Sequence, residues 1–194
     1  MKARNLYNEG FYHLYNRGVD KRNVFGDDCD RRKFLLYLLK CNIHSMVRIH
    51  AYCLMGNHFH LLVEQLEDDG IWKFMQKLGT GYTMHFNRKY GRKGRLFESS
   101  YRSVEVSSHG QYLHISRYIH MNPLNIFAPD WKEHGVKDPD IAELFLQDYK
   151  WSSYKVYMGM HSPVVDPSKI LEDFANREDY RLFVQQWMNI SGGG

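Results

Sequence analysis

The stretch AYCLMGNHFHLLVEQ, Ala51–Gln65, is the part of the sequence that decides the fold. Gly56 and Asn57 divide a largely apolar run into two segments, 47–55 and 58–65, whose composition is typical of β-strands. A Gly-Asn link of two residues predicts a β-hairpin, because both residues tolerate positive φ. Side chains alternate between the two faces of a strand. The hairpin therefore places His58 and His60 on one face and Phe59 on the other.

Two neighbouring imidazoles on one face of a strand are suited to bind a divalent metal ion in their neutral form. The His-x-His spacing is short and frequent by chance, so it does not establish a metal site by itself. Hydrogen-bonded histidines at the surface of a strand are the alternative interpretation of His58 and His60. A metal site also requires a third ligand from elsewhere in the chain.

The segments around this hairpin predict further strands and helices. A strand is expected at 11–19, a helix at 30–44 with Asp30 as its N-cap, a helix at 70–90, a strand at 96–106 and a helix at 108–122. The pair Asn122-Pro123 should end the last helix, because the α region is disfavoured for the residue before proline. The order predicts an α+β fold of the ferredoxin-like, split βαβ class, an antiparallel sheet with helices on one face. We expect residues 1–128 to form a catalytic domain. Residues 129–194 should form a small helical extension, packed on that domain or mobile.

Composition adds limits on partners and on compartment. The chain has 194 residues and is 43% apolar, enough for one sizeable core. Three cysteines without CxxC spacing argue against a disulfide framework and favour reduced thiols in a cytoplasmic protein. We expect no signal peptide and no membrane span. The glycine-rich end, 191–194, is expected to be a flexible tail.

Positive charge is concentrated in the first two-thirds of the sequence. Residues 1–129 carry 19 Lys and Arg against 11 Asp and Glu, a net charge of +8, whereas residues 130–194 carry 7 against 11, a net charge of −4. One basic stretch contains Arg88, Lys89, Arg92, Lys93, Arg95 and Arg102, with Tyr90, Phe97 and Tyr101 interleaved, and a second contains Arg17, Lys21 and Arg22. Such cations neutralise phosphates and such rings stack on bases, so both stretches are candidate DNA-binding segments. A solvated loop is the alternative for each.

The predicted helix at 108–122 carries a second group of candidate residues. His114, Tyr118 and Asn122 recur four residues apart and therefore lie along one face. Tyrosine can act as a nucleophile, and the amide of asparagine can offer an oxygen to a metal ion. On spacing alone, Tyr118 is better explained as a packing residue, and Asn122 as the residue that ends the helix.

Three segments together resemble a known family. YCLMGNHFHLLVE, GRLFESSYRS and RYIHMNPL are similar to the three signatures of the single-tyrosine HUH transposases, the IS200-like group. The Asn-Pro that follows the tyrosine resembles the branch associated with repetitive extragenic palindromes (REP). The resemblance covers residues 12–124. The chain departs from the family pattern at Gly56, where relatives usually have proline, and at Ser100, where they commonly have arginine.

The resemblance implies a mechanism and a set of partners. His58, His60 and Asn122 would bind Mg²⁺ or Mn²⁺, and Tyr118 would attack a DNA phosphate to give a 5′-phosphotyrosine. The substrate would be single-stranded DNA next to a hairpin, and the compartment the bacterial cytoplasm, at the nucleoid. A monomer is expected rather than the dimer of some relatives.

Two other functions remain open from the sequence. One is a non-catalytic module that binds hairpin nucleic acid on the same fold. The other is a metal-dependent hydrolase that uses His58 and His60 on a small substrate. The hydrolase leaves the basic, aromatic segment unexplained.

Overall fold

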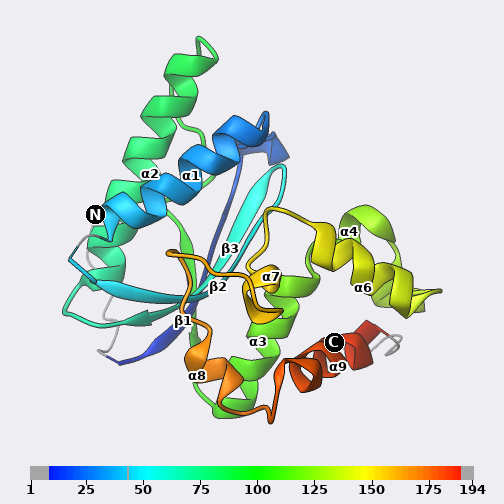
Figure 1. The fold of residues 1–194 in the computed structure, drawn as a ribbon. Coiled ribbons are helices and arrows are strands. Elements are labelled where there is room, and N and C mark those ends of the chain that lie inside the picture. The colour runs from blue at the N-terminus through cyan, green and yellow to red at the C-terminus, as the bar shows by residue number, and fades with distance from the viewer. Residues whose placement is uncertain (1–8, 43, 189–194) are drawn as a thin grey trace.

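The computed structural model describes residues 9–42 and 44–188, so the predicted flexible tail at 191–194 lies outside the described residues. Four strands form one antiparallel sheet in the order β2-β3-β1-β4 (Figure 1). Their bounds are Phe11–Arg17 for β1, Val47–Leu54 for β2, His58–Gln65 for β3 and Arg102–Val106 for β4. A helix connects β1 to β2 along the chain, and β3 lies between these two strands in the sheet. This is the split βαβ arrangement. The predicted fold class is confirmed.

The hairpin between β2 and β3 forms where the sequence predicts it, but for a different reason. The N–H of Met55 donates to the carbonyl of His58 at 2.9 Å. Neither Gly56 nor Asn57 has a positive φ, so the predicted conformational reason was wrong. Instead, the carbonyl of Gly56 accepts hydrogen bonds from two N–H groups of the neighbouring 22–26 segment. A Cβ atom at Gly56 would lie 3.1 Å from Oδ1 of Asn23, so glycine serves a close approach of two loops.

One face of the sheet is covered by α1 (Asp28–Cys41) and α2 (Gly70–Lys89) (Figure 1). Phe59 points to this face, where its ring centroid lies 5.0 Å from that of Phe34 in α1. The ring of Phe34 also packs edge-on against Tyr82 of α2, at 4.9 Å. These three side chains are almost completely buried, together with the alternate residues Tyr12 and Leu14 of β1. This face is an apolar core.

The start of α1 differs from the prediction. Asp27, not Asp30, is the N-cap, and its side chain accepts the N–H of Asp30 at 3.0 Å. Asp30 occupies the third helical position, and its carboxylate accepts N–H groups of Gly26 and Asp27 in a capping box. The side chain of Lys89, at the end of α2, also pairs with Asp30 at 2.8 Å. The predicted cap was wrong by one turn because three aspartates fall within four residues.

The opposite face of the sheet is covered by α3 (His109–Met121) (Figure 1). The side chain of Ser108 caps α3 by accepting the N–H of Gln111. The ring of Tyr112 packs on Phe11 of β1, with centroids 4.7 Å apart. Helices therefore lie on one face before α3, and α3 itself closes the other face.

The predicted strand at 96–106 forms only in its second half. Asn16 at the end of β1 donates hydrogen bonds to the carbonyls of Ser99 and Ser100, at 2.9 and 3.0 Å. These bonds occupy the backbone that a longer strand would pair with β1. Residues 96–101 therefore form a loop, apart from one bridge between Gly18 and Phe97.

The chain beyond α3 forms short helices that pack against α3 and the edge of β2 (Figure 1). They are α4 (Leu124–Phe127), α5 (Trp131–His134), α6 (Pro139–Asp148), α7 (Tyr154–Tyr157), α8 (Ser168–Leu171) and α9 (Arg177–Met188). Near the start of the chain, a 3-10 turn, η1 (Val19–Lys21), follows β1. At the edge of β2, the N–H of Leu54 donates to Trp151 and the N–H of Ser153 donates to Tyr52, at 2.8 and 2.9 Å. Across the described ranges, no helix combines the length and apolarity that crossing a membrane requires.

Candidate active site

The candidate site lies between β1, β3 and α3, on the sheet face opposite the apolar core. Side-chain alternation brings His13, His58 and His60 to this face, and α3 places Tyr118 over them. The ring centroid of Tyr118 lies 5.6 Å from that of His60 and 5.8 Å from that of His13. The side chain of Asn122, one turn after the tyrosine, lies beside those of His58 and Tyr118. The structure thus brings together the four residues that the sequence nominated for catalysis and metal binding.

His58 is held in one orientation by its neighbour. Its Nδ1 lies 2.6 Å from Oδ1 of Asn57, and an amide oxygen only accepts, so Nδ1–H is the donor. Nε2 of a neutral His58 is then unprotonated and carries a lone pair. Burial lowers the pKa of His58; the hydrogen bond with Asn122 opposes this shift, and the positive charges of Arg17 and Lys132 add to it.

His60 is oriented by a histidine that the sequence did not nominate. Nε2 of His13 lies 2.8 Å from Nδ1 of His60, in a buried contact between β1 and β3. Burial lowers the pKa of His13 to about 4, and burial with the nearby His13, His58 and Lys132 holds the pKa of His60 well below its usual range. Both rings are therefore neutral at pH 7, and Nε2 of His60 is the nitrogen left for another partner.

The nitrogen and oxygen atoms left available suit a divalent metal ion. Nδ2 of Asn122 donates to the backbone carbonyl of Tyr118 at 2.9 Å, which leaves Oδ1 as the acceptor atom of that amide. Two neutral imidazole nitrogens and one amide oxygen are ordinary ligands of a divalent transition metal ion. Within residues 9–42 and 44–188, no group of three His, Cys, Asp or Glu side chains is placed to hold a metal. A site here thus depends on Asn122 for its third protein ligand.

The nucleophile candidate is half-buried. Burial raises the pKa of Tyr118, and its hydrogen bond with Asn122 opposes that shift. The ammonium nitrogen of Lys132, in α5, lies 5.5 Å from the centre of the tyrosine ring. Sequence reasoning missed Lys132 because nothing in its neighbourhood marks it, and the fold alone brings α5 to this site.

A hollow of about 420 Å³ opens beside His58. It is lined by Tyr15, Asn16, Arg17, Asn57, His58, Glu98, Ser99 and Arg102. Arg17 stands directly opposite His58 in the pairing of β1 with β3. We call this space the site hollow.

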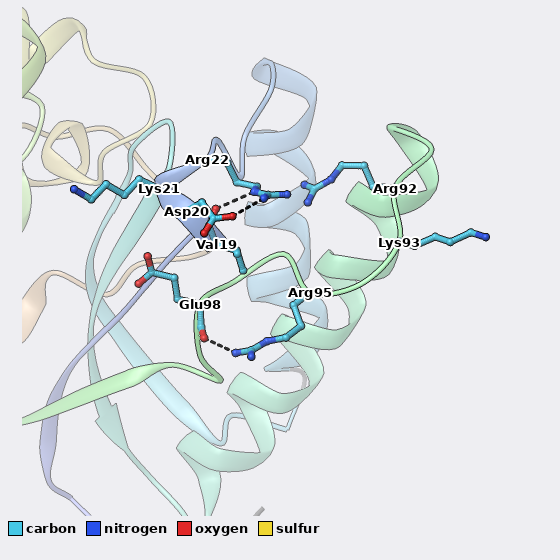
Figure 2. A pocket seen from close by; sticks show the side chains of 8 residues that line it. All are labelled: Val19, Asp20, Lys21, Arg22, Arg92, Lys93, Arg95 and Glu98. Carbon is cyan, nitrogen blue, oxygen red and sulfur yellow. Dashed lines mark hydrogen bonds and ion pairs between the residues drawn. The ribbon is translucent and has the colours of Figure 1, made fainter.

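A second and larger hollow, of about 660 Å³, adjoins the first (Figure 2). It is lined by Val19, Asp20, Lys21, Arg22, Arg92, Lys93, Arg95 and Glu98. Glu98 lines both spaces. Figure 2 shows the guanidinium groups of Arg22 and Arg92 pointing toward one another, whereas Lys21 and Lys93 point outward in opposite directions. The fold thus joins the two basic stretches of the sequence into one basic hollow.

The other nominated DNA-binding residues are placed differently. Arg17 pairs with Glu98 at 3.0 Å, and Arg22 pairs with Asp20 at 2.8 Å (Figure 2). Arg88 and Arg102 are exposed, and Arg95 donates to the backbone carbonyl of Glu98.

Two of the nominated residues have structural surroundings instead. Lys89 pairs with Asp27 and Asp30, each at 2.8 Å, and so joins α2 to the start of α1. Tyr101 is 4% exposed and belongs to the core, so its ring offers no surface for base stacking in this arrangement. The sequence pattern of alternating basic and aromatic residues does not distinguish an exposed ring from a buried one.

Comparisons with known proteins identify the family of this chain and support its fold. A family model described as "Transposase IS200 like" matches residues 7–122. The solved structure of a REP-associated tyrosine transposase bound to a REP hairpin is similar, with a TM-score of 0.60, 15% identity, and coverage of 87% of this chain and 94% of that chain. A structure described as a transposase from Deinococcus radiodurans R1 gives a TM-score of 0.43 and 21% identity, covering 61% of this chain and 95% of that chain. No curated protein matches this chain in sequence. The family model spans more than half of the chain, and the chain therefore belongs to the IS200-like transposases.

Proposed function

We propose that this transposase cleaves single-stranded DNA with Tyr118 as the nucleophile, forming a 5′-phosphotyrosine next to a hairpin. The observation that carries the proposal is the meeting of Tyr118 with His58, His60 and Asn122 on one sheet face. The hairpin is suggested by the similar structure, in which a REP-associated transposase is bound to a REP hairpin.

The chemical step is a transfer of the phosphodiester to tyrosine. The phenol of Tyr118 loses its proton to water, and its oxygen forms a bond to phosphorus. The bond from phosphorus to the 3′-oxygen breaks, and that oxygen takes up a proton to become a free 3′-hydroxyl. The ester energy is conserved in the phosphotyrosine, so a 3′-hydroxyl can attack it and rejoin strands without ATP.

His58, His60 and Asn122 would hold Mg²⁺ or Mn²⁺ through Nε2, Nε2 and Oδ1. A bound divalent ion supplies Lewis-acid neutralisation of the phosphate charge. His13 acts on this site indirectly, because its contact with Nδ1 of His60 fixes the orientation of that ring. Asn57 acts on His58 in the same way.

The DNA backbone would follow the basic hollow into the site hollow. Arg92 and Lys93 carry charge with no carboxylate partner among the ion pairs of the described residues, and Arg102 lies at the wall next to His58. Phosphate contacts of this kind make affinity fall with salt concentration. We propose a monomer as the working unit, with the nucleophile and the candidate metal ligands supplied by residues 1–128.

The decisive experiment is an adduct assay. The protein is incubated with single-stranded hairpin oligonucleotides labelled at the 3′ end, with Mg²⁺ or Mn²⁺, and resolved under denaturing conditions. A 5′-phosphotyrosine retains the 3′ label on the protein. Tyr118→Phe should lose the adduct completely, because it removes only the attacking oxygen.

The matched control is Tyr112→Phe, which removes a hydroxyl from the same helix, on a ring that packs against Phe11 and His50 instead of His58 or His60. It should form the adduct as the natural sequence does. Tight binding of hairpin DNA without any adduct under either metal ion would instead support the non-catalytic binding module. Product release without an adduct, unaffected by Tyr118→Phe, would support the hydrolase.

A further inference from the structure

One cation stands at the candidate nucleophile without being part of the family match. Lys132 lies in α5, ten residues beyond the segment 7–122 that the family model covers. Its ammonium nitrogen is 5.5 Å from the centre of the Tyr118 ring. The C-terminal extension therefore places a positive charge on the tyrosine side of the site.

The backbone of Lys132 is fixed from both directions. The neighbouring Trp131 is buried, and its indole N–H donates to Oδ1 of Asn125 at 3.3 Å. Gly135, with φ of 70°, ends α5, and the N–H of Val136 donates to the carbonyl of Met188 in α9 at 2.9 Å. The short helix is thus held between α4 and α9, and Lys132 is presented from a fixed position.

The charge of Lys132 is not compensated locally. Over residues 9–42 and 44–188, no carboxylate forms an ion pair with Lys132. Arg17, which stands opposite His58 in the strand pairing, differs in being paired with Glu98.

We propose that Lys132 is a further catalytic residue, whose ammonium group contacts a non-bridging oxygen of the scissile phosphate while Tyr118 attacks. This inference rests on the proposed function. When the oxygen of Tyr118 approaches phosphorus, negative charge from the nucleophile is brought to an already anionic phosphate. A cation presented beside the tyrosine from a fixed backbone stabilises that build-up.

The test separates the charge of Lys132 from its packing. Lys132→Met keeps the length of the side chain and removes the charge, whereas Lys132→Arg keeps the charge. Lys137→Met removes an exposed lysine five residues further on and is the matched control. The measured quantities are the single-turnover rate of adduct formation at saturating hairpin DNA and the Kd for that DNA.

Lys132→Met should slow adduct formation at least about tenfold, since a preorganised charged donor is worth this much or more. Its Kd should change less than about threefold, because one phosphate contact contributes little to the affinity of a long strand. Lys132→Arg should stay within about threefold of the natural rate. Lys137→Met should match the natural sequence in both quantities.

An unchanged rate for Lys132→Met, in a protein whose natural sequence forms the adduct, would overturn the inference and leave the proposed function intact. A change in Kd alone would also overturn it, because Lys132 would then only bind DNA. Absence of any adduct with the natural sequence would instead reject the proposed function itself. Thermal unfolding of each variant checks its fold, and Lys132→Gln replaces Lys132→Met in the same assay if the methionine variant does not fold.

Discussion

The two faces of the four-stranded sheet use alternate residues of the same strands for different purposes. Phe59 points toward α1 and α2 into an apolar core, whereas its neighbours His58 and His60 point toward α3 and meet Tyr118. On the first face, contacts are between rings and aliphatic chains. On the second, they are between imidazoles, an amide and a phenol.

This difference shows how a small domain can gather polar side chains at a candidate site without exposing its core. The buried histidines His13, His50, His60 and His120 all lie on the α3 side of the molecule. Burial of a polar group is costly unless the group is hydrogen-bonded, and each of these rings has a partner. The apolar face can therefore supply stability while the α3 face holds the polar groups of the candidate site.

Substitutions of two adjacent residues, one on each face of the sheet, test this comparison most directly. Phe59→Ala should lower the free energy of unfolding by about 3–5 kcal/mol, because it leaves a cavity in the apolar core. His58→Ala should lower it by less than about 1 kcal/mol. The same His58→Ala should slow adduct formation at least about a hundredfold, because it removes a candidate metal ligand worth several kcal/mol at the transition state.

Urea unfolding and the adduct assay together measure these effects, with Phe59→Ala assayed at a temperature where it remains folded. Isothermal titration with Mn²⁺ supplies a readout independent of catalysis, and His58→Ala should weaken this binding. If both variants lost stability equally and kept the same adduct rate, the assignment of stability to one face and of the candidate site to the other would be wrong.

The second prediction concerns pH and the α3 face. Burial lowers the pKa of His120 to about 3 and that of His13 to about 4, whereas the unfolded chain has histidine near 6.5. Below pH 6.5 the unfolded state therefore binds protons that the folded state does not. The free energy of unfolding must then decrease as the pH is lowered. We expect the loss to begin near pH 6.5 and to continue toward these lowered values.

His120→Gln should flatten this dependence by about 1.4 kcal/mol per pH unit between pH 6 and 4. Urea unfolding at several pH values in this range measures the slope. Phe34→Leu, on the apolar face, is the matched comparison, because it should lower stability by the same amount at every pH. Equal slopes for the natural sequence and for His120→Gln would contradict the prediction.

A smaller effect distinguishes two lysines that the sequence assigned to one DNA-binding stretch. Lys89→Met should lower the free energy of unfolding by about 1–3 kcal/mol, because it removes a charged partner from the buried carboxylate of Asp30. Lys93→Met, in the exposed loop, should leave stability unchanged. It should instead reduce the dependence of log Kd on log salt by about one unit.

Urea unfolding and DNA binding at several salt concentrations measure both variants. Lys89 belongs with the apolar face in this view, since it joins α2 to α1. If both substitutions altered the salt dependence equally and Lys89→Met lost no stability, Lys89 would be part of the DNA-binding surface instead.

The sequence predicted the order of strands and helices because hydrophobic periodicity and turn residues are local properties. It failed where tertiary contacts compete with local preference. The side chain of Asn16 donates hydrogen bonds to the carbonyls of Ser99 and Ser100, and the predicted fourth strand is therefore shorter than expected. Three closely spaced aspartates made the cap of α1 ambiguous, and packing resolved it by burying Asp30.

For the candidate site, the sequence alone determined the types and spacing of His58, His60, Tyr118 and Asn122, and their resemblance to the motifs of one family. Only the tertiary structure decided that these residues meet, that His13 orients His60, and that the two basic stretches form one hollow. It also decided that α5 brings Lys132 to the tyrosine. The physical reason is that alternation along a strand is fixed by the backbone, whereas the pairing register and helix packing depend on contacts between residues far apart in the chain.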